Sequence, residues 1–191
     1  LLNSFMFIIK NNYYLYIENT MSINLDYLRK NKKITIIYRN NGYAENPKKL
    51  INFRQKCKIK NFKFYIANND NLFKSCKADG LYISSYNKKI YSTRFNNLIG
   101  SAHSFKEINE KIKQGCNTIV LSRLFKTSYK NKKQFFGVVK FNLIKKNYFI
   151  NLIPLGGINN DNLLKLNLVN SNGFCMLSEI KKKPVISNRL F

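Results

Sequence analysis

Several residue types are scarce in this sequence, and each shortage argues against a class of protein. There is one histidine, His103, so a zinc centre built from histidine and cysteine clusters is not expected, and a histidine-dependent hydrolase would have to use that residue. The four cysteines lie far apart without a C-x-x-C pair, which favours buried thiols in a reducing cytoplasm over a secreted disulfide scaffold. No stretch approaches the roughly 18 apolar residues of a membrane span. We therefore expect a cytoplasmic protein with no membrane partner.

Basic residues, by contrast, are abundant. The 191 residues include 34 lysines and arginines against 9 acidic residues, for a formal net charge of +25. A hydrophobic fraction of 45% excludes a disordered polycation, and the length suits one domain with a core. The charge could mark a nucleic-acid surface, but the commonest residues share A/T-rich codons and the basic ones are spread along the whole chain. We interpret most of the charge as compositional drift, which argues against nucleic acid and still favours small anionic ligands.

Eight short apolar runs alternate with helical patterns along the chain. Most positions in each run are apolar, as in strands that are buried on both faces of a parallel sheet. The runs are Tyr13–Ile17, Ile34–Tyr38, Phe62–Ala67, Gly80–Ser84, Asn97–Ser101, Thr118–Leu121, Phe149–Leu155 and Gly173–Leu177. This number and alternation predict an α/β protein, a compact (β/α)8 TIM barrel.

The connecting segments differ in the strength of their helix signals. Ser104 and Glu107, three residues apart, form a capping box at the start of one helix. Leucines at helical spacing predict another helix over residues 160–169. The segments 70–78 and 87–96 are too short or irregular for full helices. We therefore expect some helices of the barrel to be short or missing.

Small and hydroxyl residues follow the later predicted strands. Gly156 and Gly157 come after the seventh, where phosphate sites of TIM barrels recur, and a following helix would add its N-terminal dipole. Ser178 ends the eighth strand and could complete the same cradle. Thr127 and Lys130, after the sixth, offer a hydroxyl and an ammonium suited to diphosphate. Each residue alone is equally consistent with an ordinary turn or a solvated loop.

Polar residues also end three earlier strands. The guanidinium group of Arg39 can bind a phosphate through two hydrogen bonds. Asn69 and Asp70 offer an amide and a carboxylate, which are oxygen ligands that suit Mg²⁺. Ser101 ends the fifth strand beside His103, on the face where the catalytic residues of a barrel gather. A structural histidine and solvated charges at strand ends are the alternatives.

In this order and spacing, the pieces resemble thiamine phosphate synthase and its sister enzyme, the thiazole tautomerase. The resemblance runs from about Tyr14 to Ile180 and is most specific in its second half. That half holds the Ser-Ala-His-Ser helix start, Lys-Gln-Gly before the sixth strand, the Gly-Gly-Ile-Asn turn and the Asn-Gly-Phe strand. We expect one barrel domain of this family over residues 13–183, with an N-terminal extension 1–12 and a C-terminal tail 184–191.

The resemblance implies a transferase of thiamine biosynthesis. Its two substrates would be 4-amino-5-hydroxymethyl-2-methylpyrimidine diphosphate and thiazole phosphate, with Mg²⁺ as the cofactor. The pyrimidine loses diphosphate to leave a stabilised cation, which the thiazole nitrogen captures. Such chemistry needs stabilisation of the departing negative charge rather than a strong base, so a shortage of histidine is no obstacle.

The resemblance also assigns roles to numbered residues of this chain. Substrate contacts are expected from Arg39, Asn69, Asp70, Ser101, Thr127, Lys130, Gly156, Gly157 and Ser178. Lys130, Ser101 and Thr127 would take part in catalysis. Asp70 would hold the metal if Asn69-Asp70 matches the Asn-Asp pair of the family. If the match is shifted by one residue, to Asn68-Asn69, the carboxylate is lost.

Some positions depart from the family pattern. The lysine two residues after the family's arginine is Asn41 here, the second metal aspartate aligns with Asn87, and the second threonine of the loop is Tyr129. Losing a carboxylate should weaken Mg²⁺ binding. An altered family member that binds or isomerises thiazole phosphate is therefore an alternative, although the characteristic histidine of the tautomerase falls at Arg123. A basic nucleic-acid-binding protein is a third possibility from a different class.

Overall fold

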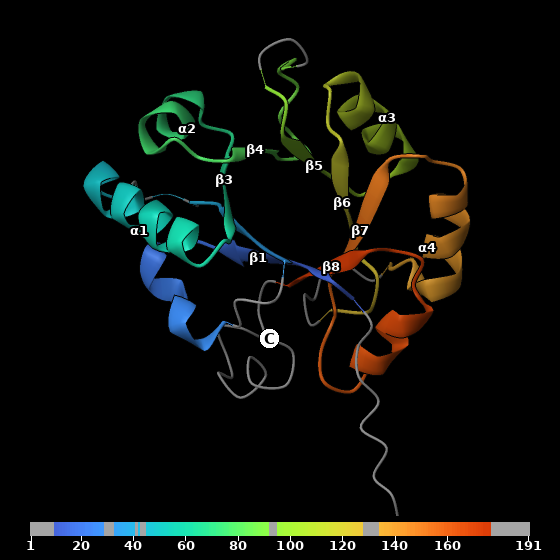
Figure 1. Ribbon diagram of the computed structural model, residues 1–191. Coiled ribbons are helices and arrows are strands. Elements are labelled where there is room, and N and C mark those ends of the chain that lie inside the picture. Colours follow the sequence, from blue (N-terminus) through green and yellow to red (C-terminus); the bar gives the residue numbers. More distant parts are fainter. Residues whose placement is uncertain are drawn as a thin grey trace, which may run out of the picture.

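The eight predicted strands are present and close into a barrel. The computed structural model describes residues 10–28, 33–40, 42, 45–91, 95–127 and 134–176. The strands are β1 (Asn12–Ile17), β2 (Lys33–Tyr38), β3 (Lys63–Ala67), β4 (Gly80–Ile83), β5 (Leu98–Ala102), β6 (Thr118–Ser122), β7 (Asn151–Leu155) and β8 (Gly173–Met176). All neighbours are parallel, and β8 pairs with β1 to close the ring. Figure 1 shows the labelled α-helices around the outside of the strands. The prediction of a (β/α)8 barrel is confirmed.

The strands are buried on both faces because each faces the barrel axis and the helix layer in turn. Along β1, for example, Tyr14 and Tyr16 belong to the apolar cluster inside the barrel. Tyr13, Leu15 and Ile17 belong to the larger cluster that packs under the helices. Alternate residues of a strand point to opposite faces, so near-continuous apolar runs supply both layers.

In the described part of the chain the helices are fewer than the strands, in line with the expectation that some are short or missing. They are α1 (Pro47–Ile59), α2 (Asp70–Cys76), α3 (Phe105–Lys113) and α4 (Gly137–Lys146), with short 3-10 helices at Thr20–Ser22, Leu25–Tyr27 and Leu163–Leu168. Asparagine or serine side chains cap the first three: for α3, the Ser104 hydroxyl accepts from the Glu107 N–H. The described residues between β4 and β5 form no helix. The helix α4 has no side-chain cap and carries no start signal that predicted it.

The prediction of a regular helix over residues 160–169 is wrong, because the segment forms a shorter helix of another type. Leu163–Leu168 is a 3-10 helix in which Leu166 is buried, whereas Leu164 and Leu168 are 45% and 68% exposed. The cause lies in the preceding turn: the side chains of Asn159 and Asn162 each accept from the other's backbone N–H, at 3.0 and 3.2 Å. Such local side-chain bonds compete with a regular helix start. The α-helix dipole expected behind the glycine pair is therefore not supplied by this segment.

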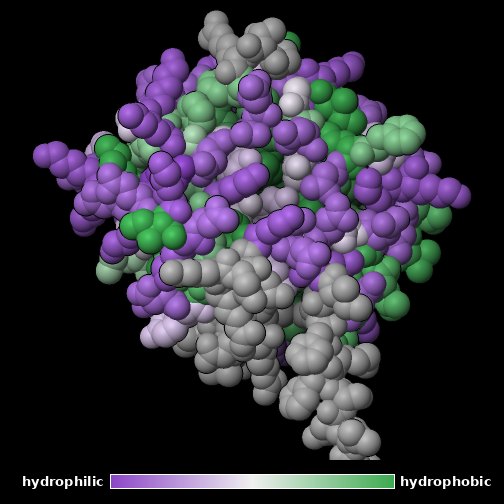
Figure 2. Space-filling model, in the orientation of Figure 1, coloured by the Kyte–Doolittle hydropathy of each residue, from purple (hydrophilic) through white to green (hydrophobic). Residues whose placement is uncertain are grey.

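The visible surface of the molecule is mostly polar. Figure 2 shows hydrophilic residues over most of one face, with hydrophobic residues scattered among them. None of the helices in the described part of the chain combines the length and the apolar character needed to cross a membrane.

Candidate functional site

Two cavities are formed by residues that follow the carboxyl ends of the strands. The first, here called the β6–β8 cavity, measures about 510 Å³ and is lined from the ends of β6, β7 and β8 and from α4. The second, the β2–β4 cavity, measures about 570 Å³ and is lined from the ends of β2 and β3 and by Tyr86 after β4. The sequence predicts that the site residues gather at this end of a barrel.

The glycine pair shapes the first cavity by close approach to the loop after β6. Gly156 and Gly157 have φ of +97° and +70°, a region that favours glycine. A Cβ on Gly157 would lie 2.4 Å from the carbonyl oxygen of Lys126 and 2.5 Å from that of Phe125, so a side chain does not fit. The Phe125 N–H donates to the carbonyl oxygen of Gly156 at 3.0 Å. The two loops are therefore held together, with Thr127 beside the glycine turn in the cavity wall.

Basic and hydroxyl groups line the same cavity. Arg123 donates from Nη1 to Oγ1 of Thr127 at 3.1 Å, and its aliphatic part lies against Gly156. Lys140 of α4 adds a second cation. Among the described residues, those that line this cavity include no carboxylate. This arrangement suits an anion such as a phosphate monoester.

The single histidine also reaches the β6–β8 cavity. Its Nδ1 lies 2.7 Å from Oγ of Ser122, and both residues line the cavity wall. Among the cavity-lining residues, sequence reasoning missed Lys140 and gave no role to Ser122. Lys140 belongs to α4, the helix without a start signal, so its position had no sequence signature. Ser122 is the last residue of the apolar strand β6, and no sequence motif singles it out.

The β2–β4 cavity contains two of the predicted residues, Arg39 and Asn69. The backbone N–H of Arg39 donates to the Ile17 carbonyl oxygen at 2.8 Å, which fixes the start of its loop. Asn69 caps α2: its side chain accepts from the Leu72 N–H at 2.9 Å. Asn69 therefore has a structural role whether or not it also touches a ligand.

Asn68 is the organising residue of this cavity wall. It has φ of +56° and makes several side-chain hydrogen bonds. Its Nδ2 donates to Oγ of Ser84 at 2.7 Å and to the Tyr86 hydroxyl at 3.1 Å. Its Oδ1 accepts from the Ser84 N–H and from Nδ2 of Asn87, both at 3.0 Å. These bonds join the end of β3 to the loop after β4, and Asn68 and Tyr86 both line the cavity.

Asp70, the predicted metal ligand, is the first residue of α2 and does not line the β2–β4 cavity. Its Oδ2 forms an ion pair with Lys89, and its Oδ1 is buried without a partner among the described residues. Those residues contain no group of three or more histidine, cysteine, aspartate or glutamate side chains that could hold a metal. One free carboxylate oxygen fits a weakly held Mg²⁺ completed by water and phosphate, and does not fit an all-protein metal cage.

Ser101 lies at the end of β5 and lines neither cavity. Ile99, two residues earlier on the same face of β5, belongs with Tyr82 to the apolar cluster inside the barrel. Burial raises the pKa of Tyr82 to about 12, and the hydrogen bonds from Ser101 and Tyr16 offset part of that rise. The two tyrosine hydroxyls are 2.6 Å apart. Ser101 therefore faces the barrel interior.

The predicted residues fall into four groups. Thr127, Gly156 and Gly157 meet in one cavity, and Arg39 and Asn69 meet in the other. Asp70 and Ser101 line neither cavity. Lys130 and Ser178, with the departures Asn41 and Tyr129, lie outside the described residues.

Fold and cavities together define a (β/α)8-barrel protein suited to small phosphorylated ligands. A family model described as thiamine monophosphate synthase matches residues 16–180, and the chain belongs to that family. The resemblance seen in the sequence is confirmed at this level.

Individual relatives agree with the family. A thiamine-phosphate synthase of Prochlorococcus marinus is 30% identical over 129 residues, which cover 65% of this chain and 37% of the relative. A thiamine-phosphate synthase of Clostridioides difficile is 28% identical over 159 residues, which cover 80% of this chain and 75% of the relative. The match thus spans little more than a third of the Prochlorococcus protein.

Solved structures confirm the fold alone. Thiamine phosphate pyrophosphorylase from Pyrococcus furiosus superposes with a TM-score of 0.70 at 17% identity, over 95% of this chain and 91% of the other. The YdjI aldolase from Escherichia coli K12 also superposes, with a TM-score of 0.64 at 7% identity, over 89% and 76%. Because an aldolase fits nearly as well, the chemistry has to be argued from the site.

Proposed function

We propose that this chain is a thiamine-phosphate synthase, which joins hydroxymethylpyrimidine diphosphate and thiazole phosphate with release of diphosphate. The observation that carries the proposal is the pair of cavities at the carboxyl ends of one barrel. Each has a volume suited to a small molecule and at least one arginine in its wall. The reaction has two phosphorylated substrates, so each cavity would hold the phosphate end of one of them.

The residues divide between the two substrates by position. Arg39 and Asn69 would bind the diphosphate of the pyrimidine in the β2–β4 cavity. Thr127, with the glycine turn at Gly156 and Gly157, would hold the phosphate of the thiazole in the β6–β8 cavity, assisted by Arg123 and Lys140. Ser178 is proposed to complete this second cradle.

The chemistry follows from where charge develops. The bond between the methylene carbon and the diphosphate oxygen breaks, and the electron pair leaves with the diphosphate. The nitrogen lone pair of the thiazole then forms a bond to the methylene carbon. Positive charge and hydrogen-bond donors stabilise the leaving oxygen more in the transition state than in the substrate. We therefore propose Lys130 and Thr127 as catalytic residues, one as the cation and the other as a hydroxyl donor. Ser101 is the third proposed catalytic residue.

Mg²⁺ is part of the proposal, with Asp70 as its ligand. The unpartnered Oδ1 supports this assignment, and the ion pair between Oδ2 and Lys89 limits the protein's donor set to one oxygen. When bound, the ion would neutralise charge on the diphosphate. We further propose that the protein acts in the cytoplasm and that residues 13–183 form its catalytic domain, between an extension at 1–12 and a tail at 184–191.

The direct test is synthesis. The purified chain, given both substrates and Mg²⁺, should form thiamine phosphate, detected by mass spectrometry. A known synthase assayed in parallel is the control. No product from this chain under conditions where the control succeeds would refute the proposal.

Arg39→Gln tests the assignment of the first cavity. We expect the KM for the pyrimidine diphosphate to rise at least tenfold, because a charge-assisted hydrogen bond to phosphate contributes about 1.5–3 kcal/mol. The KM for thiazole phosphate should stay within twofold. Lys49→Gln, on the exposed face of α1, removes the same charge and should change neither constant.

A second candidate is a family member that binds thiazole phosphate without synthesis. It is favoured by Asn87, which stands where the family has a second metal aspartate. The Nδ2 of Asn87 donates to Oδ1 of Asn68 at 3.0 Å and to the Tyr91 hydroxyl at 3.3 Å. Calorimetric binding of thiazole phosphate, with no turnover of the pyrimidine diphosphate, would identify this case. Binding of RNA or DNA that falls steeply with salt would instead support a nucleic-acid function.

A further inference from the structure

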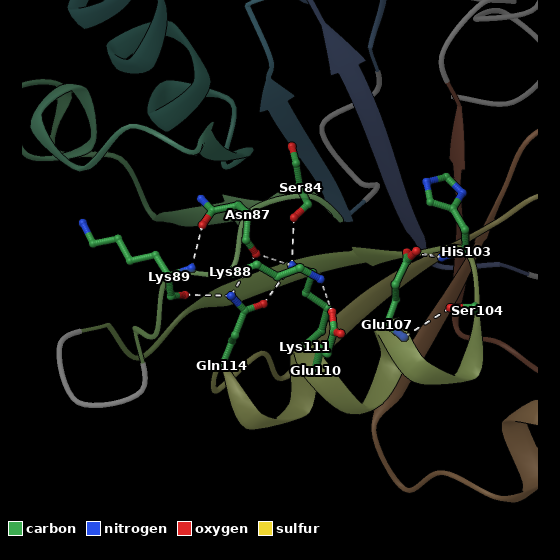
Figure 3. A network of polar contacts seen from close by, with 10 residues as sticks. All are labelled: Ser84, Asn87, Lys88, Lys89, His103, Ser104, Glu107, Glu110, Lys111 and Gln114. Carbon is green, nitrogen blue, oxygen red and sulfur yellow. Dashed lines mark hydrogen bonds and ion pairs between the residues drawn. The ribbon is translucent and has the colours of Figure 1, made fainter.

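A fully buried lysine links α3 to the loop after β4. The side chain of Lys111 has no exposed surface, and its ammonium donates three hydrogen bonds. The acceptors are the carbonyl oxygens of Ser84 and Asn87, both at 2.8 Å, and Oε1 of Gln114 at 2.7 Å. Figure 3 shows the Lys111 side chain directed from α3 to these two backbone positions. All three ammonium protons are used.

Gln114, just after α3, extends the same attachment. Its Nε2 donates to the carbonyl oxygen of Asn87 at 2.9 Å and to that of Lys89 at 2.7 Å. Together the two side chains bond three backbone carbonyls within residues 84–89, a segment without helix or strand (Figure 3). We call Lys111 and Gln114 the α3 clamp.

The clamped segment forms part of the β2–β4 cavity wall. Tyr86 lines that cavity and bonds Asn68, and Asn87 also bonds Asn68. Lys89 forms the ion pair with Asp70. A shift of this segment would therefore move the groups that face the proposed pyrimidine-diphosphate cavity, without moving the β6–β8 cavity.

Core packing alone gives no reason for a lysine at this position. Desolvation lowers the pKa of Lys111, and its hydrogen-bond acceptors are carbonyl oxygens rather than a carboxylate that would neutralise it. An apolar side chain of similar length would fill the space without burying a charge. Such an apolar side chain could not donate hydrogen bonds to the carbonyl oxygens of the loop after β4.

We propose that Lys111 and Gln114 are positioning residues that hold the loop after β4 in the shape the pyrimidine-diphosphate cavity requires. The inference rests on the proposed function for the identity of the ligand. The positioning itself can be measured with inorganic diphosphate and Mg²⁺, whether or not the chain synthesises thiamine phosphate.

Lys111→Met is the primary variant, because methionine keeps much of the length and cannot donate. Calorimetry should show at least a tenfold weaker affinity for inorganic diphosphate with Mg²⁺, while the affinity for thiazole phosphate stays within twofold. Hydrogen exchange of the amides in residues 84–89 should speed up at least tenfold. Lys113→Met, on the exposed end of α3, is the matched control and should leave all three readouts unchanged.

Gln114→Met keeps Lys111 and loses two hydrogen bonds to the loop, so it tests the clamp if Lys111→Met does not fold. It should weaken diphosphate binding in the same selective way. Unchanged diphosphate affinity in a folded clamp variant, or equal weakening of both ligands, would overturn the inference. Failure of the wild-type chain to bind diphosphate would overturn it too. Absence of thiamine phosphate alone would count against the proposed function and not against the clamp.

Discussion

Gly157 and Gly137 have almost the same backbone conformation, with φ of +70° and +69°, in different surroundings. A Cβ on Gly137 would meet nothing within 4 Å, whereas one on Gly157 would overlap two backbone carbonyl oxygens of the loop after β6. Alanine at either position costs about 1–2 kcal/mol for the left-handed conformation. We expect Gly157→Ala to lower the free energy of unfolding by clearly more than Gly137→Ala, and to weaken thiazole phosphate binding.

Urea unfolding of both variants measures the first effect, and calorimetry measures the second. Gly137→Ala is the control because it carries the same conformational penalty in open space. Equal losses of stability in the two variants would mean that the glycine turn and the loop after β6 are not in close contact. At this scale, local sequence patterns single out both glycines of the pair and Arg39, and all three line the two cavities; that they bind phosphate stays a prediction.

Other residues at the site could not be predicted, because their positions depend on packing rather than on a local pattern. Asp70 lies next to Asn69 in the sequence, but the start of α2 between them carries it out of the cavity lining. Lys140 enters the other cavity only because α4 begins where it does. The sequence shows which polar residues follow a strand. Which of them line a cavity depends on the backbone conformation after the strand, which the sequence pattern does not reveal.

Among the elements, α3 carries the clearest sequence signal, and its cap can be tested. The Ser104 hydroxyl accepts from the Glu107 N–H at 3.3 Å, and the Glu107 carboxylate accepts from the His103 N–H at 2.8 Å. Removing an N-cap hydroxyl costs about 1 kcal/mol. Ser104→Ala should therefore lower the free energy of unfolding by about 1 kcal/mol. Chemical denaturation is the measurement.

Asn109→Ala, on the exposed face of the same helix, is the control and should be neutral or stabilising because alanine is the better helix former. A neutral Ser104→Ala would contradict the capping assignment. The helix α4, by contrast, could not be predicted from a local start signal. The residue before Gly137 is a phenylalanine without a capping bond, so that helix forms through packing of Phe141 and Ile144 on the barrel rather than through a local start signal.

At the scale of the whole molecule, the number and direction of the strands were predictable because each run is apolar on both faces. The shape of the β2–β4 cavity wall was not, since Asn68 joins the end of β3 to the loop after β4 through side-chain bonds that no local pattern reveals. The +25 charge is also a property of the whole chain. Among the described residues, few of its cations line the cavities: Arg39 in one, and Arg123 and Lys140 in the other.

The buried thiols give the whole molecule a testable dependence on alkaline pH. All four cysteines are buried, and burial raises the pKa of Cys57 and of Cys116 from 9.0 to about 12. For Cys57, nearby Arg54 offsets part of this effect. Above pH 9 the unfolded chain releases a proton that the folded chain keeps. The stability that each thiol contributes is therefore fully present below pH 9 and is lost as the pH rises toward about 12.

Cys57→Ala isolates one thiol from the titration of lysines and tyrosines, which is common to both proteins. The unfolding free energy of the wild type, relative to this variant, should fall by about 1.4 kcal/mol between about pH 8 and pH 10. Urea unfolding at several pH values, with reductant present, provides the measurement. A difference that stays constant over this range would mean that Cys57 ionises equally in both states, and hence that the helix α1 does not seal it from water. A falling difference would show that the layer between α1 and the barrel stays closed while the lysines outside begin to lose their charge.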